Sequence, residues 1–201
     1  MESWLIDSPY PGMILWFFLY TSDYYMTLAT ARGYKEMDIF LHEKSFELTP
    51  QYQKDIDGQV RFSRLHITYL VGYMLVILLF WNLCLRFTYM PWLYSFLLGA
   101  LLLLEVVVHL RHLRNWYQLY IYRREGGVSG QVTFAQRFSY LNSAFDFYVH
   151  AVLFGLYGIL TFSPFFFGGV LICVVNGMRH SRYAGQASSA KPDEKHANPV
   201  S

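Results

Sequence analysis

The sequence predicts an all-α, multi-pass membrane protein: a helix bundle with five transmembrane helices. Of its 201 residues, 54% are hydrophobic and only 15% are charged, whereas about 25% are charged in soluble domains. The charged residues are also clustered, which leaves several nearly uncharged runs of the about 20 residues that a helix needs to cross a bilayer. The protein is therefore expected to be integral to a cytoplasmic or inner membrane.

The first span is expected over residues 12–31, because Pro11 suits a helix start and Gly33 suits a position just past a helix end. This span is unusually polar, with a stripe of polar side chains at helical spacing: Tyr20, Asp23, Tyr24, Thr27 and Thr30. A single aspartate in such a helix should face the interior of the bundle.

Residues 33–62 form a polar connection that is too charged to cross the membrane. Within it, Thr49 and Pro50 are typical of the first positions of a helix, and we expect a short interfacial helix that ends near Gly58. The mixed charges of this connection are most simply a solvated face: Glu43, Lys44, Glu47, Lys54, Asp55 and Asp57.

The remaining spans are expected over residues 63–85, 91–112, 133–162 and 165–181. The third helix should continue past the lipid toward residue 125, where a glycine-rich segment breaks the chain. Residues 1–183 then form one transmembrane domain, and residues 184–201, which are rich in Ala, Ser, Lys, Pro and Asn, should be a disordered tail.

The placement of basic residues predicts the orientation of the bundle. With five spans, every Lys and Arg except Arg86 falls on one side of the membrane, which is 15 of the 16. By the positive-inside rule that side is cytoplasmic, so the N-terminus is expected outside and the C-terminus inside.

Titratable side chains recur inside the expected spans at a matching depth. Glu105 and His109 are four residues apart on one span, and Asp146 and His150 repeat this spacing on another, so each pair shares a helix face. Asp23 adds a carboxylate from the first span. At a rise of about 1.5 Å per residue these side chains lie roughly 16 to 28 Å below the outer helix ends, so they could converge in one site.

Metal binding is the first interpretation of this set. Carboxylate and imidazole groups one turn apart on two helices resemble the logic of metal sites in helix bundles, and they suit Zn, Fe or Mn. Glu105, His109, Asp146 and His150 are the expected ligands, with Asp23 as a fifth ligand or a general base. A divalent metal there would support a membrane enzyme that activates water or carries out an oxidative reaction.

Three other interpretations stay open. The same groups could relay protons in a proton-coupled transporter or channel subunit, because acidic and histidine side chains in membranes commonly mark ion pathways. Haem b between His109 and His150 is disfavoured by the adjacent carboxylates. The groups could also satisfy one another in a structural or assembly subunit, with Asp146 paired to His150 or Arg137 and Glu105 paired to His109 or Arg111.

The expected partners follow from the positions of the charged and aromatic residues. Residues 111–124 interleave arginines with Trp and Tyr just inside the membrane, which favours anionic lipid headgroups and argues against nucleic acid. A homo-oligomer or a larger membrane complex is the further expectation, since most transport pathways need more helices than one such chain supplies.

Overall fold

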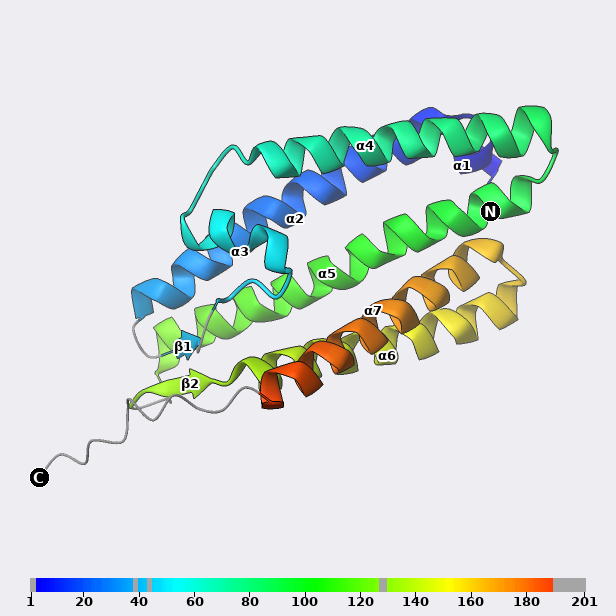
Figure 1. Cartoon of the computed structure of the whole chain (residues 1–201). Coiled ribbons are helices and arrows are strands. Elements are labelled where there is room, and N and C mark those ends of the chain that lie inside the picture. The colour runs from blue at the N-terminus through cyan, green and yellow to red at the C-terminus, as the bar shows by residue number, and fades with distance from the viewer. Residues whose placement is uncertain (1–2, 38–39, 43–44, 127–129, 190–201) are drawn as a thin grey trace, which may run out of the picture.

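The computed structural model describes residues 3–37, 40–42, 45–126 and 130–189, and the chain is almost entirely helical (Figure 1). In chain order the elements are α1 (Ser3–Ile6), α2 (Pro9–Met37), β1 (Phe40–His42), α3 (Pro50–Asp57), α4 (Arg64–Trp81), a π-helical continuation η1 (Asn82–Phe87), α5 (Pro91–Glu125), β2 (Val132–Phe134), α6 (Gln136–Thr161) and α7 (Pro164–Ser189). The all-α prediction is confirmed.

Local sequence explains where several helices begin. Proline occupies the first position of α3, α5 and α7, where its missing N–H leaves no helical hydrogen bond unmade. Helix α3 follows Thr49 as predicted, although the Thr49 side chain makes no capping hydrogen bond. Helix α7 extends to Ser189, past the position at which we expected the tail to begin, and residues 190–201 lie outside the described residues.

Within the described ranges, three helical segments are long and apolar enough to cross a membrane: Arg64–Phe87, Pro91–Glu125 and Gln136–Thr161. Their outward faces carry large apolar side chains, and on α6 Val152 is 64% exposed and Leu160 is 78% exposed. Apolar surface left in water costs about 25 cal/mol per Å², so faces of this kind are typical of helices that contact lipid. The helical structure is therefore compatible with a membrane protein.

Helix α5 lies at the centre and takes part in two separate cores. Its first half packs with α2 and α4 around Trp16, Ile77 and Leu98. Further along, Val107 on the other side of α5 packs with α6 and α7 in a second core that contains Phe147. The bundle thus consists of an α2–α4 side and an α6–α7 side that share α5 (Figure 1).

Helices α5 and α7 touch backbone to backbone near the turn between α6 and α7. A Cβ atom at Gly99 would lie 1.9 Å from the Phe165 carbonyl oxygen, and one at Gly168 would lie 1.8 Å from the Phe96 carbonyl oxygen. Only glycine permits such an approach, which is a common way to pack helices in membranes.

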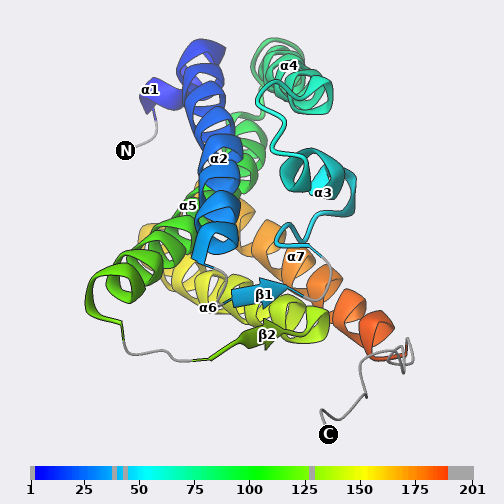
Figure 2. The same cartoon turned by 90° about the vertical axis from the view of Figure 1, so that its left-hand side faces the viewer.

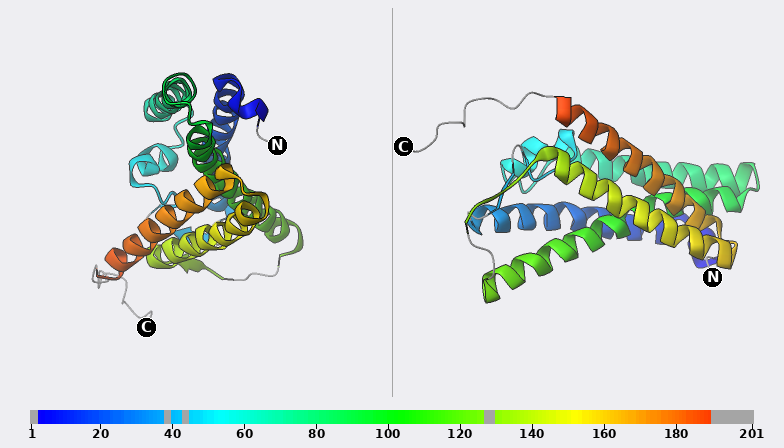
Figure 3. Two further views of the ribbon diagram at one scale, coloured as in Figure 1. Left: turned by 90° about the vertical axis from the view of Figure 1, so that its right-hand side faces the viewer. Right: turned by 90° about the horizontal axis from the view of Figure 1, so that it is seen from below.

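From this contact the helices diverge toward the opposite end of the bundle, so that α5 and the α6–α7 pair enclose a wedge (Figure 3). The connection between α2 and α4, which contains α3, covers the wide end of this wedge (Figure 2). Strand β1 pairs in parallel with β2, with His42 opposite Phe134, and this pairing ties the connection to the segment that precedes α6.

Candidate functional site

The polar faces of α2 and α5 meet each other inside the bundle. His112 on α5 donates from Nε2 to the Asp23 carboxylate at 2.9 Å, and the same nitrogen lies 3.0 Å from the Thr27 hydroxyl. One turn earlier, His109 Nε2 lies 2.7 Å from the Ser22 hydroxyl. These contacts put Asp23 and His109 in one α2–α5 interface.

The ring orientation of His109 follows from its second contact. His109 Nδ1 lies 2.7 Å from the Glu105 carbonyl oxygen, which can only accept, so Nδ1 carries a proton. In the neutral ring, Nε2 can then only accept from the Ser22 hydroxyl, whose single proton is also within reach of the Leu19 carbonyl oxygen at 3.0 Å. A metal at Nε2 would have to displace this hydrogen bond.

Glu105 is the most deeply buried acidic side chain of the polar layer, at 4% exposure. Its Oε2 has no hydrogen-bond partner among the residues that the structure describes. Burying a carboxyl oxygen without a hydrogen-bond partner costs free energy. Acidic groups in membranes are therefore rare, and those that occur tend to mark functional sites.

Two arginines of α5 link this helix to α6 across the wedge. Arg114 Nη1 donates to the Asp146 carboxylate at 2.8 Å, and Arg111 Nη1 donates to the Ser143 hydroxyl at 2.6 Å. His150 donates from Nδ1 to the Asp146 carbonyl oxygen at 2.7 Å and so makes a contact within its own helix. One oxygen of the Asp146 carboxylate is therefore bonded to an arginine from a neighbouring helix, while Oδ2 has no hydrogen-bond partner among the described residues.

Of the residues that the sequence singles out, Asp23 and His109 thus lie in the α2–α5 interface, and Glu105 interacts electrostatically with Asp23. Asp146 and His150 lie on α6 with their own partners. Within residues 3–37, 40–42, 45–126 and 130–189, no three His, Cys, Asp or Glu side chains are grouped so that they could hold a metal ion.

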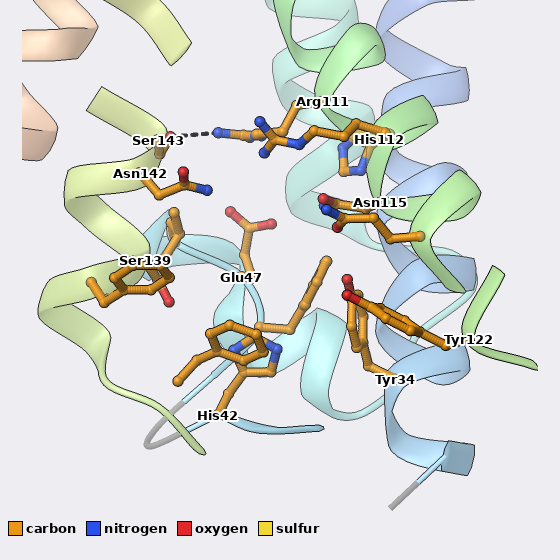
Figure 4. A pocket seen from close by; sticks show the side chains of 16 residues that line it. Tyr34, His42, Glu47, Arg111, His112, Asn115, Tyr122, Ser139, Asn142 and Ser143 are labelled. Atoms are coloured by element: carbon orange, nitrogen blue, oxygen red, sulfur yellow. Dashed lines mark hydrogen bonds between the residues drawn. The ribbon is translucent and has the colours of Figure 1, made fainter. Parts of the chain in front are cut away.

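A cavity of about 370 Å³ lies at the wide end of the wedge, and we call it the large cavity (Figure 4). Its walls are α5, α6, the last turns of α2 and the connection. The polar groups that line it are mainly amides, hydroxyls and charged side chains: Tyr34, His42, Glu47, Arg111, His112, Arg114, Asn115, Gln118, Tyr122, Ser139, Asn142 and Ser143. Small-molecule sites are usually about 300 to 1,000 Å³, so the volume suits a small solute.

Glu47 is the acidic group of the connection that points into the large cavity, between the α5 and α6 walls (Figure 4). One carboxylate oxygen accepts the Thr49 backbone N–H at 2.6 Å, and Gln53 donates to the Glu47 carbonyl oxygen at 2.9 Å. These bonds fix the Glu47 backbone and side chain against the start of α3.

The surroundings of Glu47 change its protonation. Burial raises the pKa of its carboxyl group above the ordinary value of 4.5, and the nearby Asp23 carboxylate raises it further. The hydrogen bond from Thr49 and the Arg111 guanidinium act in the opposite direction but do not cancel the rise. Glu47 therefore keeps its proton to a higher pH than an exposed glutamate does.

A second cavity of about 150 Å³ adjoins Glu47 on the α2 side, and we call it the small cavity. Its walls combine three tyrosine rings and an imidazole with several side-chain oxygen atoms: Tyr20, Asp23, Tyr24, Thr27, Glu47, Thr49, Tyr52, Ile56 and His66. Glu47 lines both cavities and so stands between the α5–α6 wedge and the Asp23 region.

No known protein-family model, curated protein or solved structure matches this chain. The geometry of the site alone therefore carries the functional argument.

Sequence reasoning missed Glu47, Arg111 and Arg114 as site residues. Arg111 and Arg114 are three residues apart and so share a helix face, distinct from the face of His109 and His112, which is a signal that the sequence does contain. Glu47 looks like any other charge of a polar connection, and its inward direction depends on how the connection folds back.

Proposed function

We propose that this chain is a five-span membrane protein that binds a small polar solute in the large cavity from the cytoplasmic side. We further propose that binding is linked to protonation of Glu47, so that the protein acts as a proton-coupled carrier or as the solute-binding subunit of one. One observation carries this proposal: the Glu47 carboxylate and the Arg111 guanidinium line one cavity beside a buried chain of acidic and histidine side chains.

The five-span topology is supported by helix length. Helices α2 and α7 have 29 and 26 residues, which exceeds the about 20 residues that a span requires. The polar side chains that lower the hydropathy of α2 contact α5, as Ser22 and Asp23 do, so they need not face lipid. With five spans, the basic residues and the wide end of the wedge belong to the cytoplasmic side.

A link to protons is supported by the order of titratable groups. Glu47 shares the small cavity with Asp23, Asp23 accepts from His112, and Glu105 lies buried about two turns before His112 on α5. Groups of this type change charge with modest changes in their surroundings and are commonly used for proton transfer in membranes. A solute that brings positive charge to Glu47 would favour its ionised form and so release a proton.

The metal-dependent enzyme is the weaker candidate on this geometry. A metal held by Glu105, His109, Asp146 and His150 would have to draw ligands from two separate interfaces, and His109 would have to leave Ser22. The carrier needs no such rearrangement of the residues that line the cavity.

A solute screen on the full chain in lipid nanodiscs tests the proposal. Binding to the folded state at one hundred times Kd stabilises a protein by about 2.7 kcal/mol, which is a clear rise in Tm. We expect at least one small polar solute to raise the Tm of the wild type, and to do so far less for the Glu47→Gln and Arg111→Gln variants.

Matched controls keep the charge changes away from the cavity. Glu36→Gln and Arg64→Gln each remove one exposed charge from outside the cavity lining and should respond like the wild type. A panel in which no solute raises the Tm, or in which the cavity variants respond as strongly as the controls, would refute solute binding at this site.

A further inference from the structure

The small cavity offers hydrogen-bond acceptors at several points of its wall. Asp23 and Glu47 contribute carboxylate oxygens, and His66 lines the same space with a side chain that is 7% exposed. His66 Nε2 has no hydrogen-bond partner among the described residues. A nitrogen buried in this way requires a partner within the cavity.

The orientation of His66 is fixed by stacking. Its ring lies between those of Tyr20 and Tyr24, with centroids 4.8 and 4.5 Å away and both pairs stacked. The Ser63 side chain caps α4 by accepting the His66 backbone N–H at 3.1 Å, which holds the start of the helix. The unpartnered nitrogen is therefore presented by a rigid support rather than by a mobile side chain.

A primary ammonium group matches this arrangement. It has three N–H donors and one positive charge, and the cavity presents two carboxylates and, in the neutral ring, one imidazole acceptor. Tyrosine rings in the wall also favour a cation over an anion. An anion would face Asp23 and Glu47 without a cationic side chain among the residues that line the small cavity.

The wall of the large cavity that carries Arg111 favours an anion instead of a cation. Arg111 and the side-chain amides of Asn115 and Asn142 line it, and a guanidinium is well suited to a carboxylate. Because Glu47 lines both cavities, a molecule that reaches past this side chain would have a cationic group on one side of Glu47 and an anionic group on the other.

We propose that the solute is a small zwitterion with a primary amine, whose ammonium group binds in the small cavity between Asp23, Glu47 and His66. Its anionic group binds toward Arg111 in the large cavity. This inference rests on the proposed function and adds the chemical class of the solute.

Isothermal titration of the full chain in nanodiscs tests the inference with defined probes: glycine, β-alanine and γ-aminobutyrate as zwitterions, and propylamine and propionate as partners with a single charge. In the wild type, at least one zwitterion should bind about tenfold or more tightly than propionate does, because its charged N–H groups gain hydrogen bonds. Equal affinity for propionate and every zwitterion, or no zwitterion binding, would overturn the inference.

A variant adds a second test. His66→Phe keeps an aromatic ring between Tyr20 and Tyr24 but removes the acceptor, and it should weaken the zwitterion about tenfold while changing propionate binding less than twofold. Tyr69→Phe, outside the lining of either cavity, is the matched control and should bind like the wild type. Equal weakening of zwitterion and propionate would contradict an ammonium site, and if His66→Phe does not fold, the wild-type probe series decides alone.

The inference and the proposed function can fail separately. A solute without an amine that stabilises the wild type but not Glu47→Gln would overturn the zwitterion and keep the carrier. If no solute binds at all, both are refuted.

Discussion

The hydrogen bond between His112 and Asp23 should couple α2 to α5 energetically, and a double-mutant cycle with Asp23→Asn and His112→Gln measures this coupling. The Asp23 side chain is 24% exposed and the His112 side chain is 4% exposed, and the two are 2.9 Å apart. A hydrogen bond to a charged group contributes about 1.5 to 3 kcal/mol, but cycles within membrane proteins average about 0.6 kcal/mol and reach about 1.7 kcal/mol. We therefore expect a coupling of about 1 kcal/mol in the free energy of unfolding, measured by titration with denaturing detergent in mixed micelles.

The same two helices provide the control for this cycle. Arg123 on α5 and Glu36 on α2 form an ion pair at 3.0 Å, with side chains that are 51% and 57% exposed. Solvent screens such a pair, so the cycle with Arg123→Gln and Glu36→Gln should give a smaller coupling than the buried pair does. A coupling of zero for Asp23 and His112, or one no larger than that of the exposed pair, would refute the buried α2–α5 interface.

Four further predictions address other parts of the molecule. Burial raises the pKa of Glu47 in the folded state above 4.5, so ionisation of this carboxyl group destabilises the fold. The stability of the wild type should therefore fall as pH rises from 4.5 through the raised pKa, and Glu47→Gln should flatten this dependence in unfolding titrations across pH. An unchanged slope would contradict the buried carboxyl group. Gly168→Ala should lower the free energy of unfolding by about 1 to 3 kcal/mol, because the added Cβ clashes with the α5 backbone. Gly72→Ala, with nothing within 4 Å of the added Cβ, is the control. Equal effects of the two substitutions would refute the close α5–α7 contact. A reporter fused after Ser201 should read cytoplasmic, and an external signal would overturn the five-span topology. Elemental analysis of purified protein should find less than one metal per chain, whereas stoichiometric Zn, Fe or Mn that is lost on replacing His109 would favour the enzyme instead.

Local sequence predicted those parts of the fold that depend on neighbours in the chain. The start of α3 at Pro50 follows from Thr49 and Pro50, and the shared face of Glu105 and His109 follows from helical spacing. His109 contacts α2, and so does His112 one turn further along. The helix ends were less predictable, because the polar last turns of α7 carry no strong stop signal before Ser189.

Contacts between distant segments could not be predicted in the same way. Asp146 had several basic residues within reach along the sequence, and only the α5–α6 crossing selects Arg114. Glu47 became a site residue because the connection folds back over the wedge, where Tyr140 of α6 donates to the Leu48 carbonyl oxygen at 3.2 Å. Neither contact leaves a periodic signal in the sequence.

Proton flux in proteoliposomes tests the central claim most directly. The chain is reconstituted with a pH-sensitive dye trapped inside, and a solute that stabilises the wild type in the screen is added outside. We predict that the solute changes the internal pH for the wild type and for Glu36→Gln, and that Glu47→Gln abolishes the change. An internal pH that no stabilising solute alters, or one that changes equally with Glu47→Gln, would contradict a proton-coupled carrier with Glu47 at its binding site.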